Sequence, residues 1–134
     1  MSVHTRSQRL AQAAFPRIQA RDAEMNSDEF KEYVTIAKKF PSLVHTCGLA
    51  QAVAFYEAKG KTKPGKPEKP HIRYLKDLAA VLTAVGHQQI GTVEQLAKKV
   101  REEPLSGYLR LSRDAINAAS WLKRYVEALA GEDE

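Results

Sequence analysis

A chain of 134 residues, 43% hydrophobic and 28% charged, has the length and composition of one soluble domain with its own core. This apolar content argues against a disordered chain, no apolar run reaches the ~18 residues of a membrane span, and no secretion leader opens the sequence. The single cysteine, Cys47, excludes an intramolecular disulfide. We therefore expect one domain over residues 1–134, located in the reducing cytoplasm.

The net charge of +5 is concentrated in two segments. Residues 1–21 contain four arginines and no acidic residue, and residues 59–73 contain six lysines and arginines against Glu68. Localised positive charge can attract a polyanion at long range. Solubility alone would explain the same composition, so charge leaves both interpretations open.

Apolar residues recur at helical spacing through most of the chain, which predicts an all-α bundle of about six helices. The first helix is expected from about Thr5 to Ala20, with a kink or break at Pro16. Asn26 or Ser27 is expected to cap the second helix. Helices joined by short loops are expected to pack antiparallel.

The middle of the chain predicts a third helix over residues 42–59, with Pro41 in its first turn and Gly60 at its end. Its apolar residues lie on nearly all sides, which predicts a place at the centre of the bundle. Gly48 would lie inside this helix at a cost of about 1 kcal/mol relative to alanine. The close approach of another helix would compensate for that cost.

Residues 60–70 read GKTKPGKPEKP, and three prolines and two glycines in this segment preclude a helix. We expect an exposed basic loop over residues 59–73. Two helices should follow, the first ending at Gly86 and the second opened by a capping box of Thr92 and Gln95.

Pro104 prevents that short helix from continuing. The last helix should carry apolar residues from Leu111 to Leu129 and end at Gly131. Residues 131–134 form an acidic tail, which we expect to be frayed.

Catalytic and metal-binding motifs are absent from the sequence. The histidines form no HExxH frame, and the lysine-rich loop lacks the spacing of a phosphate-binding loop. His45 and Cys47 lie on different sides of a helix and cannot share an ion. We therefore expect no catalytic residue, no metal, no cofactor and no small-molecule substrate.

The last helix carries a second basic surface, made of Arg110, Arg113, Lys123 and Arg124. Arg110 and Arg113 share a face, and Arg113 and Lys123 lie about 80° apart around the helix. A row of cations binds a nucleic-acid backbone by counterion release and reads no sequence. A solvated helix face is the alternative interpretation.

Most aromatic residues lie at helical spacing, where we expect core packing: Phe30, Tyr33, Phe55, Tyr56, Trp121 and Tyr125. Tyr74 and Tyr108 lie beside Arg73 and Arg110. They are the better candidates for contact with a base or ribose.

Two motifs occur in order on the chain. The first, PSLVHTCGLAQAVAFYEAKG, covers residues 41–60, and the second, YLRLSRDAINAASWLKRYVEAL, covers residues 108–129 and contains WLKR. Together they resemble the small all-helical subunit of type III-B CRISPR effector complexes, the Cmr RNA-guided, RNA-targeting assembly. The likeness extends over most of residues 27–129, with Val53 where a leucine is usual.

The resemblance implies a compact subunit without an active site that serves in antiviral defence. Several copies would stack with one another as a minor filament, beside other Cmr subunits that hold the crRNA, and would line the target-RNA groove. The resemblance implies that contact with RNA or with a neighbouring subunit is made by Lys59, Arg113, Lys123 and Arg124. Charge alone adds Lys61, Lys63, Arg73 and Arg110 as RNA-binding candidates.

Two other functions stay open. Residues 92–100 and 110–124 superficially resemble a helix-turn-helix DNA-binding protein, although the connection from Arg101 to Arg110 is longer than the usual turn and contains Pro104. A helical protein–protein adaptor, whose charges only keep it soluble, is the third possibility.

Overall fold

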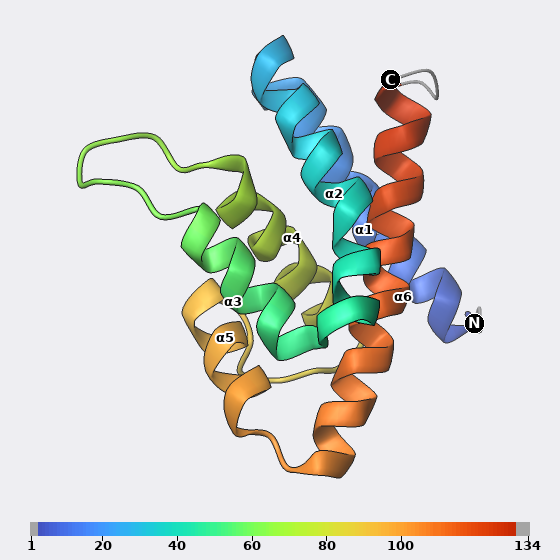
Figure 1. Cartoon of the computed structure of the whole chain (residues 1–134). Coiled ribbons are helices and arrows are strands. Elements are labelled where there is room, and N and C mark those ends of the chain that lie inside the picture. The colour runs from blue at the N-terminus through green and yellow to red at the C-terminus, as the bar shows by residue number, and fades with distance from the viewer. Residues whose placement is uncertain (1–2, 131–134) are drawn as a thin grey trace.

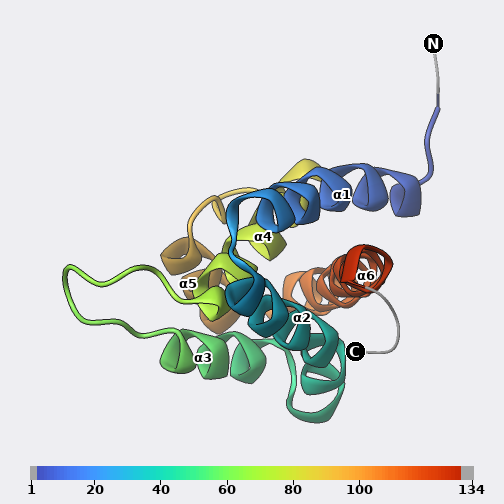
Figure 2. The ribbon, with the colours of Figure 1, turned by 90° about the horizontal axis from the view of Figure 1, so that it is seen from above.

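The computed structural model describes residues 3–130, and it is all-α over that range, as predicted (Figures 1 and 2). The helices are α1 (Arg6–Glu24), α2 (Ser27–Cys47), α3 (Leu49–Lys59), α4 (Pro70–Ala84), α5 (Val93–Glu102) and α6 (Leu105–Ala130). None of these helices is long and apolar enough to span a membrane.

The centre of the bundle is α4, which packs against all five other helices. Figure 2 shows it between α1 and α3. Its buried side chains include Tyr74, Leu75, Leu78 and Leu82, each 0% exposed. The prediction that the helix over residues 42–59 occupies the centre is wrong, because α3 packs on the outside of α4 and leaves one side in solvent.

Neighbouring helices in the sequence do not all pack together. The long helix α6 lies against α1 and α2, whereas α1 with α2 and α5 with α6 make little contact in the described part of the chain. Small buried residues on α6, Ala115, Ala118 and Ala119, let both partners approach closely. The predicted antiparallel packing of sequence neighbours is therefore wrong for these two pairs.

Both internal prolines lie within continuous helices: α1 runs through Pro16 and α2 runs through Pro41. Of the kink or break predicted at Pro16, the break is wrong, and the predicted helix start at Pro41 is also wrong. Burial of Ile18 beyond the first proline, and of Val44 beyond the second, holds each helix in the bundle despite a proline cost of about 3 kcal/mol.

The chain breaks at Gly48 instead, between α2 and α3. Gly48 has a φ of +87°, a backbone conformation that side chains with a Cβ rarely adopt. The hydroxyl of Tyr108 on α6 accepts a hydrogen bond from the backbone N–H of Ala50 at 3.1 Å. Another helix therefore approaches at Gly48, as predicted, but at a helix junction rather than inside a helix.

The other helix ends follow their sequence signals. Asn26 caps α2, and Thr92 and Gln95 form the predicted capping box on α5, which ends before Pro104. The last helix begins at Leu105, so the connection between α5 and α6 is much shorter than expected. Gly131 and the acidic residues 131–134 lie outside the described residues.

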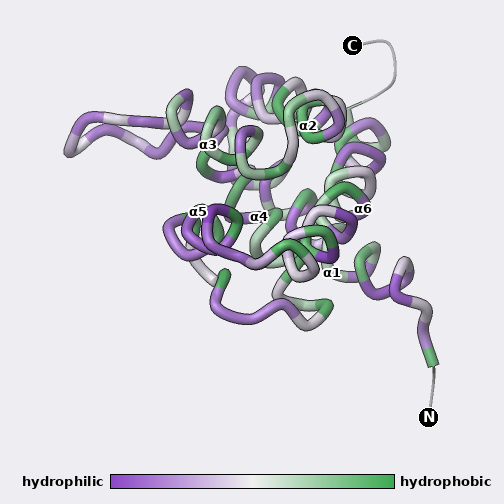
Figure 3. Tube along the Cα trace, turned by 60° about the horizontal axis from the view of Figure 1, so that its bottom comes forward, coloured by the Kyte–Doolittle hydropathy of each residue, from purple (hydrophilic) through white to green (hydrophobic). Residues whose placement is uncertain are grey.

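The basic loop is shorter than predicted. Residues 60–69 lie between α3 and α4 and are mostly hydrophilic (Figure 3). Lys59 is the last residue of α3, and Arg73 lies in α4. Figures 1 and 2 both show the loop projecting on the opposite side of the molecule from α6.

Candidate nucleic-acid interface

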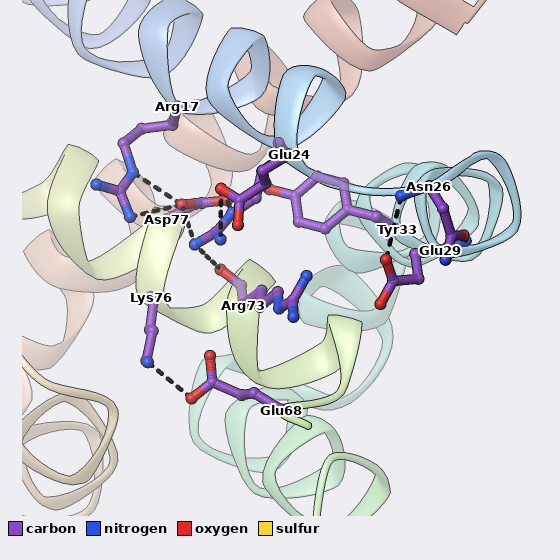
Figure 4. Close-up of polar contacts among 10 residues, drawn as sticks. Arg17, Glu24, Asn26, Glu29, Tyr33, Glu68, Arg73, Lys76 and Asp77 are labelled. Atoms are coloured by element: carbon purple, nitrogen blue, oxygen red, sulfur yellow. Dashed lines mark hydrogen bonds and ion pairs between the residues drawn. The ribbon is translucent and has the colours of Figure 1, made fainter. Parts of the chain in front are cut away.

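Two N-terminal arginines bind a carboxylate buried at the centre of the bundle. Asp77 on α4 is 0% exposed, and its oxygens lie 2.7 Å from Nη2 of Arg17 and 3.0 Å from Nε of Arg21. The hydroxyl of Tyr33 on α2 also donates a hydrogen bond to Asp77 (Figure 4). Because a buried carboxylate needs such partners, Arg17 and Arg21 act in holding the fold together.

A second buried carboxylate, Asp114 on α6, engages Arg6 at the start of α1. Arg6 donates from Nη2 at 2.6 Å and from Nε at 3.1 Å, and Nε2 of His87 lies 2.7 Å from the same carboxylate. Burial raises the pKa of Asp114, but hydrogen bonds from Arg6 and His87 outweigh it and hold that pKa below its usual range. Three of the four arginines in residues 1–21 therefore serve internal ion pairs, which leaves little of that charge for a polyanion.

The arginines of α6 are placed differently. Arg110, Arg113 and Arg124 are exposed, and Arg113 and Arg124 lie only about 20° apart around the helix axis. The exposed residues between them, Asn117 and Ser120, carry no charge. We call this surface the α6 cationic face: Arg110, Arg113, Asn117, Ser120 and Arg124.

The α6 cationic face contains no carboxylate. Asp114 is buried on the inner side of α6. The half-buried Glu127 lies one turn beyond Arg124 at the edge of the face, and it forms no ion pair within residues 3–130. The three arginines form no ion pair with residues 3–130. Their guanidinium groups are thus available to an external anion.

Lys123 is half-buried and lies off this face, about 100° from Arg124 around α6. On the far side of the molecule, Lys59, Lys61 and Lys63 are exposed at the end of α3 and in the loop. Arg73 is half-buried on α4, and its carbonyl accepts a long hydrogen bond of 3.5 Å from Arg21. The eight candidate residues therefore fall into separate groups instead of one continuous strip.

Two aromatic residues differ from prediction: Tyr74 is buried instead of available to RNA, and Phe55 is exposed instead of in the core. Tyr74 is 0% exposed among other aromatic rings, and burial raises its pKa well above the ordinary value. Its predicted contact with a base is therefore wrong, because α4 is central and turns Tyr74 inward. Phe55, predicted in the core, is 48% exposed.

The remaining aromatic residues are closer to expectation. Phe30, Tyr33 and Tyr56 are buried, as predicted. Trp121 and Tyr125 are half-buried on α6, and the ring of Tyr125 packs edge-on against Phe15. Tyr108 is half-buried at the Gly48 junction, where its hydroxyl already has a backbone partner.

Cys47 packs against the core at the end of α2, and its thiol donates to the carbonyl of Leu43 at 3.1 Å. Within residues 3–130, no group of three or more His, Cys, Asp or Glu side chains is placed to hold a metal ion.

The helices α5 and α6 are joined by Glu103 and Pro104 but barely touch, so they do not form a packed helix-turn-helix unit.

Comparison with known proteins gives the family. Residues 6–129 match the profile of CRISPR-associated protein (Cas_Cmr5). The chain belongs to the Cmr5 family. It is 38% identical over 130 residues to the CRISPR system Cmr subunit Cmr5 of Thermus thermophilus, an alignment that covers 97% of this chain and 100% of that protein. A crystal structure of a CRISPR-associated Cmr5 family protein from Thermus thermophilus is similar, with a TM-score of 0.72 and 35% identity over 95% of this chain and 98% of that one.

Membership of the Cmr5 family confirms the resemblance drawn from the two sequence motifs. The structure brings these motifs into contact, because Tyr108 of the second binds beside Gly48 of the first.

Sequence reasoning missed two lysines, Lys38 and Lys39, which line a groove with Phe55. Their proximity depends on how α2 packs beside α3, which helical periodicity alone does not predict.

Proposed function

We propose that this Cmr5-family chain is a non-catalytic subunit of a cytoplasmic Cmr effector complex in antiviral defence, and that it contacts target RNA through the α6 cationic face. Several copies stack beside the other Cmr subunits and line the groove for crRNA-paired target RNA. The observation that carries the proposal is the contrast between two sets of arginines. Three of the four arginines of α1 pair with buried aspartates, whereas the three arginines of α6 are exposed and form no ion pair within residues 3–130.

The spacing of these arginines suits an extended phosphate backbone. Arg113 and Arg124 lie eleven positions apart, which corresponds to about 16 Å along the helix axis. This distance is several times the ~3.4 Å rise between phosphates of one strand in a duplex. Guanidinium groups bind phosphates through paired hydrogen bonds. Such contacts read no bases, which suits a complex whose specificity comes from pairing between guide and target.

Four of the remaining candidate residues form a second contact region in this proposal: Lys59, Lys61, Lys63 and Arg73. The basic loop carries Lys61 and Lys63 outward between Lys59 and Arg73, where they reach RNA or a neighbouring subunit. Lys123, on the flank of α6, contacts the same partners. The long reach of the loop lets this region act apart from the α6 cationic face.

The test is target-RNA loading by the assembled complex. We expect the triple variant Arg110→Gln/Arg113→Gln/Arg124→Gln to assemble with its partners and to load less target RNA. The matched control, Lys31→Gln/Lys98→Gln/Arg101→Gln, removes the same charge from exposed positions elsewhere and should load RNA as the wild type does. Unchanged loading by the first variant, or equal loss in both, would contradict the proposed contact.

A further inference from the structure

A groove between α2 and α3 places an exposed aromatic ring among lysines. It has a volume of about 420 Å³, and its lining includes Lys38, Lys39, Ser42, Leu43, Thr46 and Phe55. We call it the Phe55 groove. It is built from helices other than α6, so it is separate from the α6 cationic face.

Phe55 faces outward because of how its neighbour Tyr56 is anchored. Tyr56 is 3% exposed, and its hydroxyl donates to the carbonyl of Ile36 on α2 at 2.7 Å. This hydrogen bond sets the rotation of α3 against α2, which turns the adjacent Phe55 side chain outward. An exposed ring in a groove offers a flat surface on which a planar group can stack.

The charged residues that line the groove, and the one that lies over the Phe55 ring, are all lysines. Nζ of Lys59 lies 5.5 Å from the centroid of the Phe55 ring, within reach of a cation–π interaction. Lys38 and Lys39 line the groove itself, and the residues that line the groove include no carboxylate. The hydroxyls of Ser42 and Thr46 add hydrogen-bonding groups of the kind that contact phosphates and ribose.

We propose that the Phe55 groove binds single-stranded RNA, with one base stacked on Phe55 and the adjacent phosphates held by Lys38, Lys39 and Lys59. This inference rests on the proposed RNA-binding function and adds a further contact to it. Single strands combine a π face and phosphates in successive nucleotides, which is the pattern that aromatic residues and lysines recognise together. An apolar protein segment fits less well, because docking it would remove ammonium groups from water without a counter-charge.

The experiment measures the affinity of the isolated full chain for a fluorescently labelled, single-stranded oligoadenylate. Base–aromatic stacking of the usual strength predicts that Phe55→Ala weakens binding about fivefold or more, whereas Phe55→Trp, which keeps an aromatic face, retains affinity. Phe15→Ala is the matched control, because Phe15 is also exposed (39%) but lies on α1. In a Trp121→Phe background, RNA should quench the fluorescence introduced by Phe55→Trp.

The possible results separate this inference from the proposed function. If Phe55→Ala binds RNA as the wild type does while the triple α6 variant binds weakly, the Phe55 groove is overturned and the α6 contact stands. If Phe55→Ala weakens binding and the triple variant does not, the groove stands and the α6 contact falls. Weakened assembly with Cmr partners at unchanged RNA affinity would show a protein-docking groove and overturn the inference.

Discussion

Asp114 on α6 and Arg6 on α1 form a two-point ion pair, with N–O distances of 2.6 and 3.1 Å, between residues 108 positions apart in the sequence. Asp77 on α4 binds Arg17 and Arg21 from the same helix α1. The helix α1 is therefore held against the rest of the bundle by ion pairs with two buried carboxylates, Asp77 and Asp114. We expect stability to depend on these pairs more than on exposed ones.

Replacing Asp77 by alanine should lower the free energy of unfolding by about 3–5 kcal/mol, because removal of one partner leaves buried charge without compensation. Urea unfolding followed by circular dichroism measures this change. The matched control is Glu68→Gln, which breaks the exposed pair with Lys76 and should cost about 1 kcal/mol or less. Equal effects of the two substitutions would contradict the structural role of Asp77.

The pH dependence of stability should include a contribution from Asp114. Its pKa in the folded chain lies below the usual value, so the folded state binds the proton less readily than the unfolded state does. The stabilisation is present above the unfolded pKa of about 3.9 and is lost as the pH falls through the folded pKa. Stability measured between pH 7 and pH 3 should fall more steeply in the wild type than in Asp114→Asn, and parallel curves would refute this assignment.

Gly48→Ala should destabilise the chain by about 1–3 kcal/mol, because the φ of +87° at this position is strained for any residue with a Cβ. The new Cβ would also lie 3.5 Å from the hydroxyl of Tyr108, an ordinary contact that adds little. Gly91→Ala is the control, since Gly91 does not have a positive φ and its Cβ would meet only Gln95 at 3.6 Å. Thermal unfolding midpoints compare the two, and a neutral Gly48→Ala would argue against strain at the junction.

Local sequence signals predicted the all-α class and several helix ends correctly. The capping box of Thr92 and Gln95 and the stop before Pro104 act through groups within one turn of the chain. Such signals are readable because the groups they satisfy are close in sequence. The same reasoning is wrong about a helix break at Pro16 and a helix start at Pro41, where packing against distant helices holds the helix together.

The candidate site was less predictable, because it depends on which residues are already engaged by partners far away in sequence. Arg17 and Arg113 carry the same side chain, yet Arg17 pairs with Asp77 while Arg113 is exposed. Helical spacing predicts Phe55 in the core, although the side chain is exposed. Its exposure follows from the anchoring of Tyr56 to α2, a contact that periodicity does not specify.

The most direct test of RNA binding by the α6 cationic face is the salt dependence of affinity for a single-stranded RNA. Each phosphate neutralised adds about 0.7 to the slope of log K against log salt for a single strand. The slope of the Arg110→Gln/Arg113→Gln/Arg124→Gln variant should therefore be smaller than that of the wild type by about 2, with weaker binding at every salt concentration. Identical slopes and affinities for wild type and variant would contradict the account.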